Sequence, residues 1–88
     1  MGFLEALEMG VNIQLGNKVV IQFACLEGYV AFELGREEVE ELVRRLERGE
    51  PTVFRRGDLV VLYWPRPHIA RKVISRLRLW LRMWNRNP

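Results

Sequence analysis

The stretch VNIQLGNKVVIQFACLEGYVAFEL, residues 11–34, decides the fold. Apolar and polar side chains alternate along it, which is typical of β-strands that have one buried face. Glycine-containing turns at residues 16–17 and 27–28 separate the alternating segments. We therefore expect a three-stranded antiparallel meander formed by residues 11–15, 18–26 and 29–34.

The segment before this meander has a weaker pattern. Residues 1–10, MGFLEALEMG, place Phe3, Leu4 and Leu7 at a spacing compatible with one helical turn. We expect this segment to be either a short helical turn or a loose N-terminal extension.

The segment after the meander, GREEVEELVRRLERG, predicts an amphipathic helix over residues 35–49. Acidic residues at its start suit the positive end of the helix dipole, and Gly49 supplies a stop signal. The apolar residues fall on one face at helical spacing, namely Val39, Leu42, Val43 and Leu46. We expect a loop over residues 50–56 to follow it.

Residues 58–64, DLVVLYW, predict a strand that is apolar on both faces. Strands of this kind are usually covered on both sides, yet this one would be an edge in a four-stranded monomer. A sheet completed across a dimer would reconcile the pattern with the strand count. The residues that we expect in an oligomer interface are Val60, Leu62 and Trp64, together with Leu79 and Met83.

The last segment predicts a long amphipathic helix over residues 69–86, with Pro67 suited to its first turn. One arc of the helical wheel is apolar, formed by Ile69, Ala70, Val73, Ile74, Leu77, Trp80, Leu81 and Trp84. We expect this arc to pack on the sheet. The order β-β-β-α-β-α then gives an α+β fold, and a length of 88 residues favours a single domain.

The residue inventory disfavours an enzyme. One histidine, His68, and one cysteine, Cys25, cannot form a Cys/His zinc site or a disulfide. Ser75 and Thr52 are the only hydroxyl residues besides two tyrosines, so a serine-type triad is not expected. We predict no catalytic residue, no metal and no cofactor, and we expect Cys25 to be a small buried apolar residue.

Composition favours a folded, cytoplasmic protein. No uncharged stretch approaches the roughly 18 residues that a membrane span requires, and the N-terminus lacks the basic and apolar regions of a signal peptide. Charged residues far outnumber amides and hydroxyls, which indicates a thermophilic source.

The charge distribution is the strongest indication of function. Residues 1–50 hold ten acids and five bases, a net charge of −5, whereas residues 59–88 hold seven bases and no acid, a net charge of +7. The overall charge of +3 therefore conceals a dipolar molecule. The positive charge is concentrated on the last helix, in Arg71, Lys72, Arg76, Arg78, Arg82 and Arg86.

Three interpretations of this basic helix remain open. Its guanidinium groups could meet nucleic-acid phosphates, or they could pair with the acidic helix of the same chain, of a symmetry mate or of another partner. A third possibility is that the helix lies on an anionic membrane surface. Burial of its apolar arc contributes roughly 10–15 kcal/mol gross, more than the net stability of about 5–10 kcal/mol of a small domain. The helix is therefore expected in the core rather than on a membrane.

Overall fold

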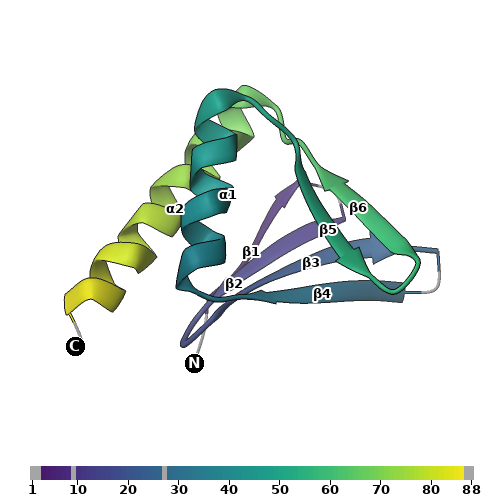
Figure 1. The fold of residues 1–88 in the computed structure, drawn as a ribbon, viewed down its shortest axis with the longest axis horizontal. Helices are drawn as coiled ribbons and strands as arrows, with labels where there is room; N and C mark the ends of the chain where they lie inside the picture. Colours follow the sequence, from purple (N-terminus) through teal and green to yellow (C-terminus); the bar gives the residue numbers. More distant parts are fainter. Residues whose placement is uncertain (1–2, 9, 27, 87–88) are drawn as a thin grey trace. The chain divides into compact units, whose positions relative to one another are not determined.

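The computed structural model describes residues 3–8, 10–26 and 28–86, and the side chains of residues 10–26 and 28–83. The chain divides into two compact units, Met1–Val39 and Glu40–Pro88. The elements follow one another as β-β-β-β-α-β-β-α, with one more strand before each helix than predicted, and the α+β class is confirmed (Figure 1). The single domain expected from the length stays a prediction.

The first unit holds a four-stranded antiparallel sheet in the order β1-β2-β3-β4. The predicted meander is confirmed as β2 (Val11–Leu15), β3 (Val19–Cys25) and β4 (Gly28–Leu34). The register places Ile13 opposite Ile21, and Ile21 opposite Phe32. All three side chains are buried, because residues directly opposite one another share a face of the sheet.

The fourth strand of this sheet, β1 (Phe3–Glu8), corrects the expectation of a helical turn or a loose segment. It pairs antiparallel with β2, and the register shifts between Ala6 and Glu8. The physical reason is that β2 would otherwise present a row of unpaired backbone groups, which a neighbouring segment of almost any composition can satisfy. The spacing of three apolar residues did not reveal this pairing.

Cys25 is exposed, and the prediction that it is a buried apolar residue is wrong. It pairs with Gly28 as the last pair of β3 and β4, directly beside the turn. A side chain at the tip of a hairpin has few neighbours, so the alternation that buries Ile21 and Phe23 ends before residue 25.

Helix α1 (Arg36–Arg48) matches the predicted helix, and its apolar stripe is buried as expected. The backbone N–H of Gly35 donates to Glu38 Oε1 at 2.9 Å, as in a capping box. At the other end Gly49 has φ = 71°, Gly49 N–H donates to Leu46 O, and Glu50 N–H donates to Arg45 O. This is a Schellman motif, which explains why the helix ends at Arg48.

Strand β5 (Thr52–Arg56) replaces the predicted loop and pairs antiparallel with β6 (Leu59–Tyr63) in a separate two-stranded sheet. Thr52 and Phe54 are buried while Val53 and Arg55 are exposed, as strand alternation requires. The loop prediction failed because Pro51 and the Arg55-Arg56 pair are residue types typical of loops. The strand forms because it pairs with β6.

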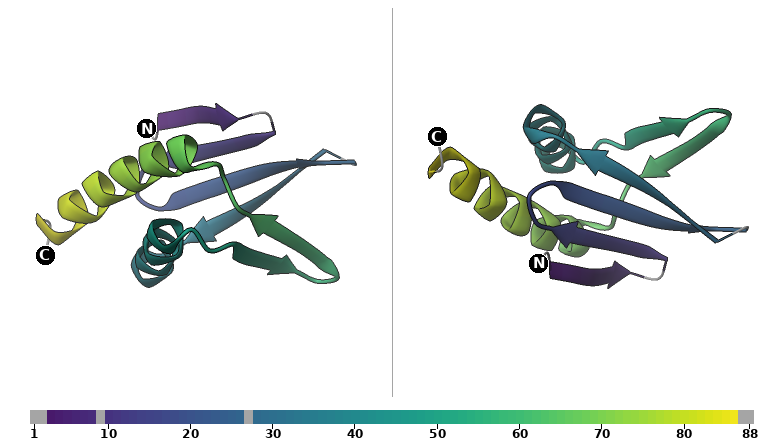
Figure 2. Two further views of the ribbon diagram at one scale, coloured as in Figure 1. Left: turned by 90° about the horizontal axis from the view of Figure 1, so that it is seen from above. Right: turned by 90° about the horizontal axis from the view of Figure 1, so that it is seen from below.

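Helix α2 (Pro67–Arg86) confirms the long C-terminal helix and the place of Pro67 at its start. The first backbone hydrogen bond runs from Ala70 N–H to Arg66 O at 2.8 Å. Figure 2 shows α2 as the long helix that leads to the C-terminus. The packing of α2 on the sheet stays a prediction.

Candidate nucleic-acid interface

Helix α2 is amphipathic as predicted. Its buried residues are Ala70, Val73, Leu77 and Trp80, with Ile69, Ile74 and Leu81 half-buried. The predicted basic residues Arg71, Lys72, Arg76, Arg78 and Arg82 are all exposed. The side chains of Trp84 and Arg86 lie outside the described residues, so the expectations for them are not tested.

The helical repeat divides the exposed face of α2 into strips. At 100° per residue, Arg71, Arg78 and Arg82 fall on one flank. Lys72 and Arg76 lie toward the other. Leu79 and Met83 lie on the same side of the helix as Lys72 and Arg76. Their side chains are 50% and 57% exposed. The face that was predicted to be basic therefore contains an apolar strip.

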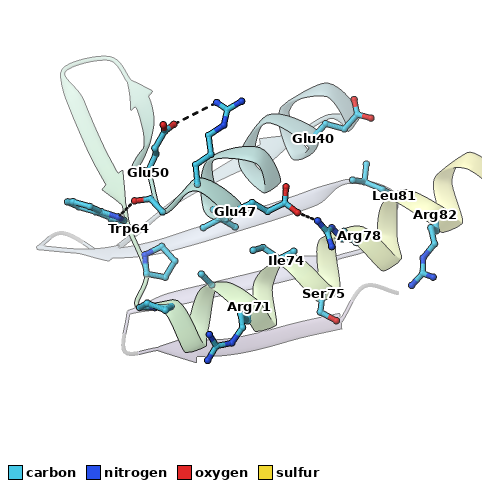
Figure 3. Close-up of a pocket in the computed structure, with 16 residues that line it drawn as sticks. Glu40, Glu47, Glu50, Trp64, Arg71, Ile74, Ser75, Arg78, Leu81 and Arg82 are labelled. Carbon is cyan, nitrogen blue, oxygen red and sulfur yellow. Dashed lines mark hydrogen bonds and ion pairs between the residues drawn. The ribbon is translucent and has the colours of Figure 1, made fainter.

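The arginine flank of α2 borders a groove of about 1280 Å³ within the second unit. Figure 3 shows α1 and α2 on its two sides. The α1 side carries Glu40 and Glu47, and the α2 side carries Arg71, Arg78 and Arg82. Apolar side chains that line the groove include Leu46, Ile74 and Leu81. Lys72 and Arg76 are not among its lining residues.

Trp64 lies at one end of this groove, where its indole N–H donates to Gly49 O at 2.9 Å (Figure 3). The bond links the residue after β6 to the residue after α1. The backbone of Gly49 is in the left-handed conformation, which residues with a Cβ atom rarely adopt. Trp64 was predicted as the last residue of the strand over residues 58–64 and as an interface residue, whereas β6 ends at Tyr63. No pattern in the sequence indicated its contact with Gly49.

Glu47 and Arg78 form an ion pair across the groove, from α1 to α2 (Figure 3). The two side chains are 36% and 58% exposed, so water screens the attraction and the pair contributes only about 0–1 kcal/mol. Pairing of the basic helix with acids of its own chain was one of the interpretations left open. The ion pair engages one of the predicted phosphate-binding cations.

Among the described side chains, three other cations of α2 lack the kind of ionic partner that Arg78 has. Arg71, Lys72 and Arg82 have no ion pair with any acid of the described part of the chain. Figure 3 shows Arg71 and Arg82 extended away from Glu47. Because α2 contains no acidic residue, these three charges are not neutralised within their own helix.

Acids of α1 and of the loop after it are engaged locally. Glu41 accepts hydrogen bonds from Arg44 at 2.8 Å and from Arg45 at 3.0 Å. These two guanidinium groups lower the pKa of Glu41. Glu50 lies 4.0 Å from both Arg45 and Arg48. The acidic helix therefore satisfies part of its charge internally.

The residues predicted for an oligomer interface are exposed and lie on two elements. Val60 and Leu62 on β6 and Trp64 just after it are 50%, 64% and 67% exposed. Leu79 and Met83 lie on α2. Their role in self-association stays a prediction.

Two further properties bear on the class of site. Among residues 3–8, 10–26 and 28–86, no helix is both long and apolar enough to cross a membrane. Over the same residues, no group of three or more histidine, cysteine, aspartate or glutamate side chains is placed to hold a metal ion.

Comparison with known proteins gives no assignment. No family model matches the chain, and neither a curated protein nor a solved structure is significantly similar to it.

Proposed function

We propose that this protein is a non-enzymatic binding module that contacts the phosphate backbone of nucleic acid through the exposed face of α2. The observation that carries the proposal is the set of three exposed cations, Arg71, Lys72 and Arg82, none of which pairs with an acid in the described part of the chain. Arginine suits phosphate because its planar fork can donate two parallel hydrogen bonds. Contacts of this kind give affinity without sequence preference.

The length of the arginine flank, which runs from Arg71 to Arg82, favours an extended polyanion as the ligand rather than a single phosphate. Arg71 and Arg82 are eleven positions apart on α2, which corresponds to about 16 Å along the helix axis. An isolated phosphate cannot contact both ends of this flank. A nucleic-acid strand offers a phosphate at each nucleotide along its path.

The test compares two variants that lose the same charge. In the first, Arg71, Lys72 and Arg82 are all replaced by glutamine. In the charge-matched control, Lys18→Gln, Arg44→Gln and Arg55→Gln remove three exposed cations that lie outside α2. Affinity for labelled single-stranded and duplex oligonucleotides is measured by fluorescence anisotropy at low salt.

We expect the α2 variant to lose roughly tenfold or more in affinity, because phosphate neutralisation dominates non-specific binding. The control should lose about threefold or less. Equal losses in the two variants would reduce the interaction to net charge alone and contradict a site on α2. Circular dichroism checks that both variants keep the fold of the wild type.

The ion pair between Glu47 and Arg78 favours a second candidate, in which α2 binds the acidic surface of a protein partner. In this pair a guanidinium group of α2 associates with a carboxylate of α1. Carboxylates on the surface of another protein would offer the cations of α2 the same kind of contact. Absence of oligonucleotide binding at low salt would remove the first function and favour this one.

A further inference from the structure

Strand β6 has one open edge. It pairs with β5 through a two-residue turn in which Gly57 has φ = 59°, and no other strand of the described chain joins this sheet. Alternate residues of an antiparallel strand direct their N–H and C=O groups away from the paired neighbour. The outer side of β6 therefore presents backbone donors and acceptors that a further strand could satisfy.

This edge lacks the features that usually prevent strand addition. Leu59–Tyr63 reads LVVLY, with no proline and no charged residue, and its register with β5 runs without a shift. By contrast, the outer strand β1 of the four-stranded sheet carries two glutamates and a register irregularity between Ala6 and Glu8. Charges and bulges of that kind discourage pairing at an edge.

One face of the same hairpin is also open to solvent, and it is apolar except at Arg55. The register places Leu62 opposite Val53 and Val60 opposite Arg55, so these four side chains share a face. Val53, Val60 and Leu62 are 45%, 50% and 64% exposed. A two-stranded hairpin with such a face gains stability when further strands extend it.

We propose that the open edge of β6 pairs antiparallel with β6 of a second copy of this chain, across a two-fold axis at Val61. In that register Val60 lies opposite Leu62 of the second copy, and Leu59 lies opposite Tyr63 of the second copy. All five residues of the strand are paired. The result is a four-stranded sheet in the order β5-β6-β6-β5.

The second copy fits this edge because the pairing is self-complementary. Directly opposite residues share a face, so the exposed residues Val60 and Leu62 of one copy meet Leu62 and Val60 of the other. No charged residue of β6 faces another across the axis, since the strand contains none. A two-fold interface requires that one surface match itself in this way.

A cycle of charged substitutions tests the register. Val60→Glu alone and Leu62→Lys alone each place charges opposite apolar residues of the second copy, and we expect each to raise the dimer dissociation constant roughly tenfold. Glutamate is used at position 60 because Arg55 of the same hairpin lies opposite it. In the double variant Val60→Glu/Leu62→Lys the two opposite charges face each other twice across the axis. Its dissociation constant should return to within about threefold of the wild-type value.

Cysteine cross-linking tests the axis independently. In a Cys25→Ser background, Val61→Cys places two thiols opposite each other, with Cα atoms about 4.5–5.5 Å apart, a distance that a disulfide spans. Mild oxidation should give a covalent dimer of about twice the 10.4 kDa chain mass. Val53→Cys in the same background, on the far strand of the hairpin, should cross-link much more slowly.

Sedimentation velocity of the wild-type chain supplies the direct readout, with circular dichroism to check the fold of each variant. A dimer that responds to the charge cycle and cross-links at position 61 supports the proposal. A monomer at every concentration would leave the edge to a strand of another protein and overturn it. A dimer that ignores both perturbations would place the interface elsewhere and overturn it as well.

Discussion

Glu47 on α1 forms an ion pair with Arg78 on α2, in a groove whose α2 side also carries Arg71 and Arg82. Among the described residues Glu47 pairs with Arg78 alone, and Arg71 and Arg82 have no ionic partner. In this arrangement Glu47 competes with any phosphate that approaches Arg78.

Glu47→Gln should therefore strengthen nucleic-acid binding. Release of Arg78 adds one potential phosphate contact, so the slope of log affinity against log salt should become steeper by about 0.9 on duplex. Anisotropy titrations at several salt concentrations measure this slope. Glu37→Gln removes the same charge from an exposed position in the first turn of α1. An equal change in that control would mean that net charge, rather than Arg78, is responsible.

Gly49→Ala should destabilise the protein by about 1 kcal/mol. Gly49 adopts φ = 71° at the end of α1, a conformation that strains a residue with a Cβ atom. For a chain of this size the melting temperature should fall by about 4–8 °C, as measured by circular dichroism. Asparagine tolerates this conformation better than alanine, so a Gly49→Asn variant as unstable as Gly49→Ala would contradict the assigned cause.

Leu77→Ala and Leu79→Ala should differ sharply in stability although they lie two positions apart on α2. Leu77 is fully buried, and its truncation should cost about 2–5 kcal/mol. Leu79 is half exposed, so the same change should cost less than about 0.5 kcal/mol. Urea denaturation gives both values. Similar losses at the two positions would mean that the wrong face of the helix has been assigned to the interior.

Glu41 should make a small, acid-sensitive contribution to stability. Hydrogen bonds from Arg44 and Arg45 lower its pKa in the folded state, so this contribution is fully present above the unfolded-state pKa. It is lost as the pH falls through the lower folded-state value. Denaturation of wild type and Glu41→Gln at several pH values checks this, and the difference between them should shrink below about pH 4. A difference that grows on acidification would contradict the sign.

Much of the fold was predictable because burial imposes a period on the sequence. Val39 and Leu42 fall on the buried face of α1 at helical spacing, and Ile21 and Phe23 fall on the buried face of β3 at a spacing of two. These patterns are local. The strand β5 depends instead on a pairing partner, and the exposure of Cys25 depends on its position beside a turn.

The candidate site was predictable only in part. The exposed cations of α2 follow from the helical wheel, since an amphipathic helix of known register has one possible outer face. The groove does not follow from it, because Glu47 and Arg78 are far apart in the chain. The hydrogen bond from Trp64 to Gly49 depends on how two connections approach each other, which periodicity does not encode.

The salt dependence of oligonucleotide binding by the wild-type chain tests the central claim most directly. If Arg71, Lys72 and Arg82 each neutralise one phosphate, a plot of log affinity against log salt should have a slope of about −2.7 on duplex. Replacement of all three cations by glutamine should flatten that slope nearly to zero. A slope that stays the same after this replacement would contradict a phosphate-binding face on α2.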